Sequence, residues 1–472
     1  MISANSLVAV GDEEGRVRLL DPDRDSKSPF AGVFLGFRVH KNAIIDMSFS
    51  ADDSILATAS GDQTSRIVDM TTQTTFTILA HHSASLKQVC FMPGSNSILA
   101  TSSRDGAVKI WDLRCKGDDG PRHSFYKHVP NGPVTTNSAA RIPTWGRPVR
   151  AITDTHRYPY YNHLGQLDCN NDVPSRSEMP GRAGAMSVTA ISFLPEGREH
   201  FLLTASESDA SVKLWDIRSI ANKRRGHIAL SQTKQPESHN QFRHFGIGSI
   251  NVNGAGTRLY TLCKDNTVYA YSTAHLILGH APELASEDSA HRFAPKETKE
   301  GLGPMYGFRH PQFHATSFYV KSAIRKAKDG KSEMLAVGSS DGCAVLFPTD
   351  ERYLSTQESH VSAQDLQSAG SAPTFESFGS RRVGSGLPGK ARDGILRSTN
   401  GTALIRGHDR EVGSVCWTHD GDLITVGDDY YVRCWREDGD AARDLRMNGE
   451  SEGRRYACGW ADVEEDYDEE DD

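Results

Sequence analysis

The sequence predicts an all-β fold built from seven copies of one strand–turn–strand unit, and three observations indicate this. An acidic residue stands six positions before a bulky apolar residue at seven places along the chain. Small or apolar residues precede each acid, and the segment after it alternates as a strand does. Turn-forming residues surround the acid, as in Arg104-Asp105-Gly106, because glycine tolerates positive φ and aspartate bonds its own backbone. The seven pairs are Glu14 and Leu20, Asp62 and Val68, Asp105 and Trp111, Asp209 and Trp215, Asp265 and Tyr271, Asp341 and Phe347, and Asp429 and Trp435.

This unit resembles the WD-repeat family, whose repeats form the four-stranded blades of a β-propeller. Seven copies imply a seven-bladed WD-repeat β-propeller. Such a ring needs about 300 residues at roughly 40–45 per blade, so a chain of 472 residues must also carry insertions and tails. We expect the propeller to span residues 1–447, with flexible insertions at 116–185, 275–305 and 350–400.

The first blade begins abruptly. Residues 7–10 and 16–20 fit its second and third strands, and residues 30–37 fit its outer strand. Only six residues precede them, so either the chain is truncated at its N-terminus or another segment supplies the inner strand. The C-terminal segment often completes the first blade of a propeller, and residues 456–461 within the segment 448–472 are the candidate. Residues 462–472 form a short acidic tail.

The remaining blades follow in order, and each is expected to hold strands on either side of its turn acid. The predicted strands are 44–49 and 55–60 in blade 2, 86–91 in blade 3, 188–193, 201–206 and 211–215 in blade 4, and 247–252, 258–262 and 267–271 in blade 5. Blade 6 is expected to start near 317–321 and to pass through 335–338. Blade 7 is expected to hold 411–417, 423–426 and 431–435, with 441–447 as its outer strand.

Three histidines stand at a constant distance before turn acids. His40, His82 and His408 precede their acids by 22, 23 and 21 residues. In WD repeats such a histidine, the turn acid and a Ser or Thr form a hydrogen-bonded network with the Trp. We therefore expect structural roles for these histidines and for the turn acids, because the repeat spacing scatters them around a ring. The acids are Asp62, Asp105, Asp209, Asp265, Asp341 and Asp429.

The charge balance argues against a broad nucleic-acid-binding surface. The formal net charge is −8, but nine of the 61 acids lie in 462–472, which leaves 52 acids against 53 Lys and Arg. A local basic patch is still expected in the first turn of the sixth blade. Its residues are Lys321, Arg325, Lys326 and Lys328.

Cysteine usage favours a reducing, intracellular compartment, because the eight cysteines form no CxxC pair. No apolar run reaches the roughly 20 residues of a membrane helix.

The sequence indicates a protein that is not an enzyme and needs no cofactor or metal. Residues 338–342 match a GxSxG nucleophile pattern, but they coincide with the repeat's own turn, whereas a nucleophile elbow needs a following helix. Residues 384–391 approach a phosphate-binding loop without its final Ser or Thr.

Two successive blades end in Trp-Asp-aliphatic-Arg. The motifs are Trp111-Asp112-Leu113-Arg114 and Trp215-Asp216-Ile217-Arg218. Each arginine is expected just past its strand, on the same rim, where a guanidinium can make forked bonds to a partner's carboxylates or carbonyls. The alternative is an ordinary salt bridge on that rim.

A doubled motif of this kind is similar to that of substrate receptors of cullin-4 ubiquitin ligases. The resemblance implies that Asp112, Arg114, Asp216 and Arg218 dock on the ligase's damage-specific DNA-binding adaptor. Further strings resemble the denticleless-type receptors of replication-coupled proteolysis, although Val68 stands where that family usually has Trp. They include residues 59–64, 111–115, 317–322, 411–417 and 459–461.

That resemblance implies a nuclear protein that presents substrates bound to the sliding clamp for ubiquitination. Their degrons carry a basic residue, so an acidic pocket on the top face or in the central channel is expected. The same resemblance makes the basic patch of the sixth blade a candidate contact with DNA or the clamp. The alternative function is a generic WD-repeat scaffold in chromatin or RNA-processing complexes.

Overall fold

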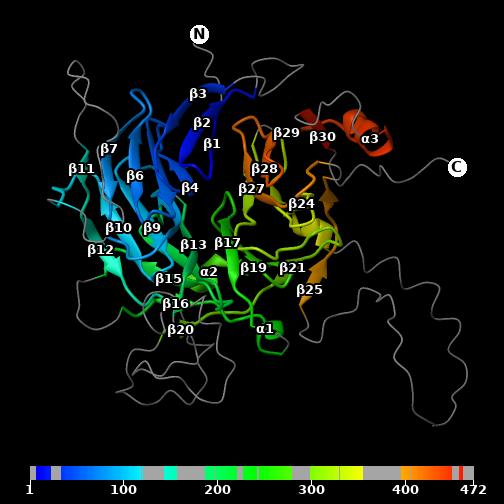
Figure 1. Cartoon of the computed structure of the whole chain (residues 1–472). Helices are drawn as coiled ribbons and strands as arrows, with labels where there is room; N and C mark the ends of the chain where they lie inside the picture. Colours follow the sequence, from blue (N-terminus) through cyan, green and yellow to red (C-terminus); the bar gives the residue numbers. More distant parts are fainter. Residues whose placement is uncertain are drawn as a thin grey trace, which may run out of the picture.

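Seven β-sheets arranged as the blades of a ring make up the computed structural model of the chain (Figure 1). This confirms the predicted seven-bladed β-propeller. The structure describes residues 7–22, 33–118, 120, 143–156, 186–195, 197–220, 227–241, 244–278, 298–328, 330–354, 395–404, 407–448 and 457–460.

The first four blades follow the chain. Blade 1 holds β1 (Val8–Gly11), β2 (Arg16–Leu20) and β3 (Val33–Arg38). Blade 2 holds β4 (Ile44–Phe49), β5 (Ile55–Ser60), β6 (Ser65–Asp69) and β7 (Thr74–Leu79), with β11 (Thr144–Trp145) added at its edge. Blade 3 holds β8 (Leu86–Phe91), β9 (Ile98–Ser103), β10 (Val108–Asp112) and β12 (Pro148–Ile152). Blade 4 holds β13 (Val188–Phe193), β14 (Phe201–Ser206), β15 (Lys213–Asp216), β16 (Ser231–Gln232) and β20 (Lys299–Glu300).

Blades 5 to 7 complete the ring. Blade 5 holds β17 (Ile247–Val252), β18 (Arg258–Cys263), β19 (Thr267–Ser272), β21 (Tyr306–Phe308) and β25 (Leu396–Ser398). Blade 6 holds β22 (Ser322–Arg325), β23 (Met334–Val337), β24 (Val345–Pro348) and β26 (Thr402–Ala403). Blade 7 holds β27 (Val412–Trp417), β28 (Leu423–Gly427), β29 (Val432–Glu437) and β30 (Ala457–Trp460). The helices are α1 (Glu237–Gln241), α2 (Thr273–Ile277), α3 (Gly439–Asn448) and a 3-10 helix at Glu351–Leu354.

The turn between the second and third strands explains why the acid recurs. The residue after the acid takes positive φ in several blades, with Gly106 at 76° and Gly342 at 79°. Gln63, Asn266 and Tyr430 occupy the same place at 69°, 59° and 66°. The acid bonds amides of its own turn, as Asp105 does with the amide of Ala107 at 3.0 Å. The acid therefore stabilises a left-handed turn even where glycine is missing.

The predicted insertion 116–185 contains more structure than expected. Residues 148–152 form β12, the outer strand of blade 3, and residues 144–145 form β11. The composition is rich in Pro, Gly and Arg, but Ala151 and Ile152 complete the ladder with β10, and Ile152 is buried. The other two predicted insertions are likewise ordered at their ends, in β20 and β25.

Two predictions for the C-terminal region are wrong. Residues 441–447 lie in the helix α3 rather than in a strand, because Asp438 caps the helix by accepting from the amide of Ala441 at 3.0 Å and helix-forming residues follow. The strand predicted at 456–461 does not join blade 1. Instead β30 pairs in parallel with β29 as the outer strand of blade 7.

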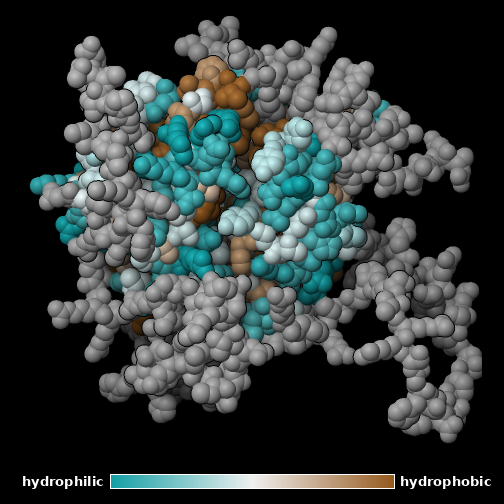
Figure 2. All heavy atoms as spheres, viewed as in Figure 1, coloured by the Kyte–Doolittle hydropathy of each residue, from teal (hydrophilic) through white to brown (hydrophobic). Residues whose placement is uncertain are grey.

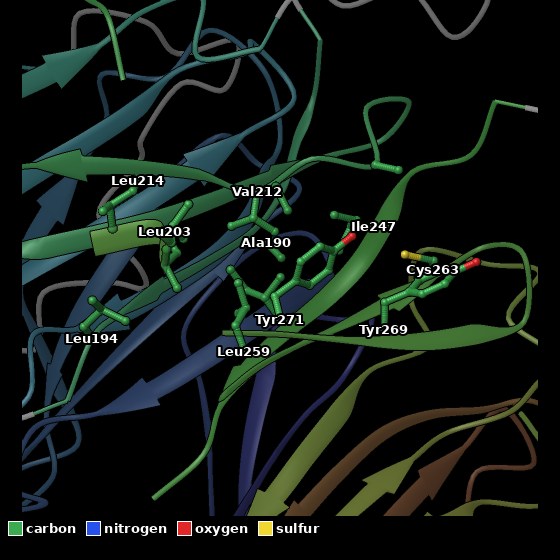
Figure 3. Close-up of a cluster of buried hydrophobic side chains, with 14 of the residues drawn as sticks. Ala190, Leu194, Leu203, Val212, Leu214, Ile247, Leu259, Cys263, Tyr269 and Tyr271 are labelled. Atoms are coloured by element: carbon green, nitrogen blue, oxygen red, sulfur yellow. The ribbon is translucent and has the colours of Figure 1, made fainter. Parts of the chain in front are cut away.

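Hydrophobic clusters between neighbouring blades form the core. The cluster between blades 4 and 5 brings Leu203 and Leu214 from one sheet against Leu259 and Tyr271 from the next (Figure 3). Similar clusters join blades 1 and 2, 2 and 3, 3 and 4, 5 and 6, and 6 and 7. Among the residues that the structure describes, no such cluster combines strands of blades 7 and 1.

The inner strands of neighbouring blades interlock through polar side chains. Asp46 accepts from the amide of Val89 at 2.9 Å, and Ser48 accepts from the amide of Phe91 at 3.3 Å. Because both contacts advance two residues on each strand, β4 and β8 run in the same direction. Each blade therefore presents the end of its third strand on one rim, which we call the lower rim, and its turn acid on the opposite, upper rim.

Candidate docking surface on the lower rim

Hydrogen-bonded networks centred on buried histidines connect the strands within several blades. His82 Nδ1 contacts Asp105 at 3.0 Å, its Nε2 contacts the Thr101 hydroxyl at 2.8 Å, and Trp111 Nε1 donates to that hydroxyl at 2.8 Å. Burial lowers the pKa of His82, so the imidazole is neutral and its Nδ1–H donates to the carboxylate. Its Nε2 then accepts from the threonine, whose oxygen accepts from the indole.

The same network occurs in blade 7, and blade 2 has a shortened form. His408 contacts Asp429 at 3.0 Å and Thr425 at 2.7 Å, and Trp435 donates to the same hydroxyl at 2.9 Å. In blade 2, His40 contacts Asp62 and Thr58 at 2.9 and 2.7 Å, but Val68 replaces the indole.

Sequence reasoning missed the histidine of blade 4. His156 contacts Asp209 at 2.9 Å and Thr204 at 3.1 Å, and Trp215 donates to Thr204 at 3.0 Å. It lies 53 residues before its acid because the insertion falls between them. The usual interval of about 22 residues therefore could not reveal it.

The turn acids of blades 5 and 6 have other partners. Asp265 accepts from the Tyr269 hydroxyl at 2.7 Å and lies 3.6 Å from Arg309. Asp341 pairs with His314 at 2.6 Å, and both side chains are partly exposed. Asp341 therefore faces solvent on the upper rim.

The first Asp-x-Arg turn follows β10 on the lower rim. Asp112 accepts from the amide of Arg114 at 3.0 Å, and the guanidinium forks back onto the same carboxylate, with Nε at 2.9 Å and Nη2 at 2.8 Å. The hydrogen bonds from Arg114 hold the pKa of Asp112 below its usual value and raise the pKa of Arg114. The arginine side chain stays 69% exposed.

The second turn repeats this geometry one blade further on. Asp216 accepts from the amide of Arg218 at 2.9 Å, and Nε and Nη2 both lie 3.0 Å from its oxygens. The side chain of Arg218 is 65% exposed. Arg150 of β12 donates to the carbonyl of Ile220, which ties blade 3 to blade 4 beside both turns.

Both guanidiniums are held in a fixed position but do not use all of their N–H donors within the turn. An arginine has five N–H donors, and the fork uses Nε–H and one Nη2–H. Three donors on the outer edge of each guanidinium are then directed away from the blade. The geometry suits carboxylates or carbonyls of an approaching protein, because the fork limits the side-chain entropy lost on binding.

The predicted basic patch does not form one surface. Lys321 immediately precedes β22, and its Nζ donates to the carbonyl of Gly248 at 2.8 Å. Arg325 is buried and bonds Glu437 at 3.1 Å, and its guanidinium lies 5.1 Å from the ring centroid of Trp417 and 5.4 Å from that of Trp460. The remaining two, Lys326 and Lys328, are exposed in the loop after β22, which is on the lower rim.

On the upper rim, cations surround the aromatic pair that precedes β22. Lys264 Nζ lies 4.1 Å from the ring centroid of Phe318, and Lys87 Nζ lies 5.5 Å from that of Tyr319. The acidic pocket expected on this face therefore does not lie at these two aromatic residues.

Acidic side chains gather instead where blades 6 and 7 meet. Glu411 accepts from the hydroxyl of Ser340 at 3.2 Å, and its carbonyl accepts from the amide of Asp428 at 2.9 Å. Asp341 adjoins Ser340, and Tyr430 next to this group is 90% exposed. We call Asp341, Asp409, Glu411 and Asp428 the upper acidic group.

Within the described part of the chain, no group of three or more His, Cys, Asp or Glu could hold a metal ion. None of the helices described here is long and apolar enough to cross a membrane.

Comparison with known families decides the type of propeller. The profile of the family "WD domain, G-beta repeat" matches residues 33–69, 72–112, 176–216 and 400–436. The chain is a WD-repeat β-propeller. Its matched segments include both Asp-x-Arg turns up to their aspartates.

Among WD-repeat proteins, the chain is similar to denticleless-type proteins over most of its length. It is 27% identical to cell division cycle protein cdt2 of Schizosaccharomyces pombe over 91% of this chain and 66% of the relative. It is 25% identical to denticleless protein homolog A of Xenopus laevis, over 96% of this chain and 49% of the relative. For the denticleless protein homolog of Homo sapiens the identity is 24%, over 91% and 44%. The chain thus spans between about two fifths and two thirds of these relatives.

Proposed function

We propose that this WD-repeat propeller is the non-enzymatic substrate-recognition subunit of a cullin-4 RING ubiquitin ligase. One observation carries the proposal. Two exposed guanidiniums, Arg114 and Arg218, are held in identical forked turns on adjacent blades of one rim. The similarity to cdt2 and denticleless proteins supports the same reading.

The lower rim would dock on the damage-specific DNA-binding adaptor of the ligase. Asp112 and Asp216 position the two guanidiniums, and the outward donors would pair with carboxylates or carbonyls of the adaptor. Lys326 and Lys328 lie on this same rim. A clamp or DNA contact through these two lysines would therefore come from the side of the adaptor.

The upper rim would receive the substrate in the nucleus. Degrons of replication proteins held on the sliding clamp carry a basic residue, and the upper acidic group offers the matching charge. Tyr430 and Tyr431 beside it are exposed and could cover the stem of a lysine or arginine.

The test is adaptor binding by the full chain with Arg114→Ala and Arg218→Ala combined. A charge-assisted hydrogen bond contributes about 1.5–3 kcal/mol, so we expect the double variant to bind at least tenfold more weakly. Arg16→Ala is the matched control, because Arg16 is also exposed and pairs with an acid two residues earlier, Glu14 at 3.2 Å, but lies on the upper rim.

A second measurement checks that the double substitution weakens adaptor binding without affecting the upper rim. A fluorescent degron peptide should bind the double variant and the parent chain equally, because the two rims are separate. Equal adaptor binding by the double variant and the Arg16→Ala control would reject the proposal and favour the scaffold alternative.

A further inference from the structure

A third turn on the lower rim repeats the geometry of the two Asp-x-Arg motifs. In blade 6, Asp350 accepts from the amide of Arg352 at 3.0 Å, Nε lies 2.9 Å from the carboxylate, and Nη2 lies 2.8 Å from it. The side chain of Arg352 is 78% exposed. These contacts match those of Arg114 and Arg218, although Phe347-Pro348 stands where the other motifs have Trp-Asp.

Strand register places this turn on the same rim. The last residue of β24, Pro348, lies beside Met334, just as Asp112 lies beside Ile98 at the end of β10. Asn400 donates to the carbonyl of Tyr353 at 2.8 Å, which fixes the short helix that carries Arg352.

Blade 5, which lies between the blades of the second and third turns, also has an arginine on the lower rim. Arg258 begins β18 on the lower rim, and its Nη2 lies 2.6 Å from Glu351 of blade 6. Blades 3, 4, 5 and 6 therefore each bring a guanidinium to this rim. We call Arg114, Arg218, Arg258 and Arg352 the arginine arc.

Blade 2 shows that the turn itself does not require arginine. Asp69 accepts from the amide of Thr71 at 2.8 Å, which is the same backbone contact, but threonine occupies the second position. The aspartate thus serves the turn of the repeat, while the arginine is an addition that three blades carry.

We infer that the adaptor-docking surface extends beyond the doubled motif to Arg352, so that the partner contacts a four-blade arc and offers it acidic side chains or carbonyls. This inference rests on the proposed function. A flat partner surface could meet the whole arc, because all four residues lie at strand ends, or a few residues beyond them, in consecutive blades on one rim.

The experiment measures the affinity of the full chain for the purified adaptor by biolayer interferometry. We expect Arg352→Ala to raise Kd about tenfold, and the charge reversal Arg352→Glu to raise it further. Arg16→Ala, from the upper rim, should leave Kd unchanged. Thermal unfolding of each variant checks the fold, and unchanged midpoints are expected because these side chains are exposed.

The outcomes separate the two ideas. If Arg352→Ala and Arg352→Glu bind like the parent while Arg114→Ala with Arg218→Ala binds weakly, the arc is wrong and the proposed function stands. If all these variants bind like the parent, the proposed function fails with it.

Discussion

At the scale of single residues, the buried threonine is the centre of each histidine network. Thr101 contacts both His82 Nε2 and Trp111 Nε1, whereas Thr58 of blade 2 has His40 but no indole to satisfy. Removing one hydroxyl therefore leaves two buried nitrogen atoms unpaired in blade 3 and one in blade 2.

We expect Thr101→Val to destabilise the protein more than Thr58→Val. An unsatisfied buried polar group costs about 1–3 kcal/mol, so the losses should be about 2–5 and 1–3 kcal/mol. Urea unfolding followed by tryptophan fluorescence measures both. Equal losses would show that the indole bond contributes nothing to stability.

At the scale of elements, repetition made the two strands on either side of each turn acid predictable. The acid at the turn and the alternating strand after it recur because every blade solves the same packing problem. Outer strands were less predictable, since β12 lies within the predicted insertion 116–185 and β16 has only two residues. Residues 441–447 formed a helix because the cap at Asp438 outweighs their weak alternation.

The functional residues were also predictable only where they belong to the repeated motif. The doubled Trp-Asp-x-Arg motif pointed to Arg114 and Arg218, which do lie on one rim. Arg352 escaped notice because Pro348 displaces its aspartate two residues along the chain. The useful signal is an acid two residues before an arginine after a third strand, whatever precedes it.

The strand β30 depends on one aromatic anchor. Trp460 is 1% exposed and packs against Trp417 at 6.3 Å between ring centroids, with Arg325 at 5.4 Å. Trp460→Ala should cost about 3–5 kcal/mol and detach β30 from β29. Hydrogen exchange at residues 432–437 would increase. Tyr430→Ala, at an exposed position, is the control and should change stability by under about 0.5 kcal/mol; similar effects would contradict the anchor.

At the scale of the whole molecule, buried histidines distributed around the ring make stability depend on pH. Burial lowers the pKa of His40, His82, His156 and His408. The unfolded chain therefore binds more protons than the folded chain below about pH 6.5, so acidification favours unfolding. Burial alone would raise the pKa of Asp62, but its hydrogen bonds to His40 and Thr64 outweigh burial and lower the pKa to about 2. Protonation of Asp62 therefore also favours unfolding, at lower pH than that of the histidines.

Two buried carboxyl groups oppose this trend, because burial raises the pKa of both Asp46 and Asp265. Burial raises the pKa of Asp46 to about 6, so the folded state takes up a proton first and gains stability between about pH 6 and 4. Burial also lowers the pKa of His239 and His310, so among the described residues six histidines against two aspartates predict a melting temperature that falls from pH 7 to pH 5. Calorimetry across this range checks it, and a flat or rising melting temperature would contradict the neutral, buried histidines.

The join between blades 7 and 1 has a mechanical consequence. No described sheet contains strands from both ends of the chain, and blade 1 has three strands with hydrophobic area on its face (Figure 2). Among the described residues, blades 7 and 1 therefore share neither a sheet nor a hydrophobic cluster. Local unfolding should therefore begin at this junction. Protease cleavage under native conditions is expected first in blade 1, while blades 3 to 6, which carry the arginine arc, remain folded and resist cleavage.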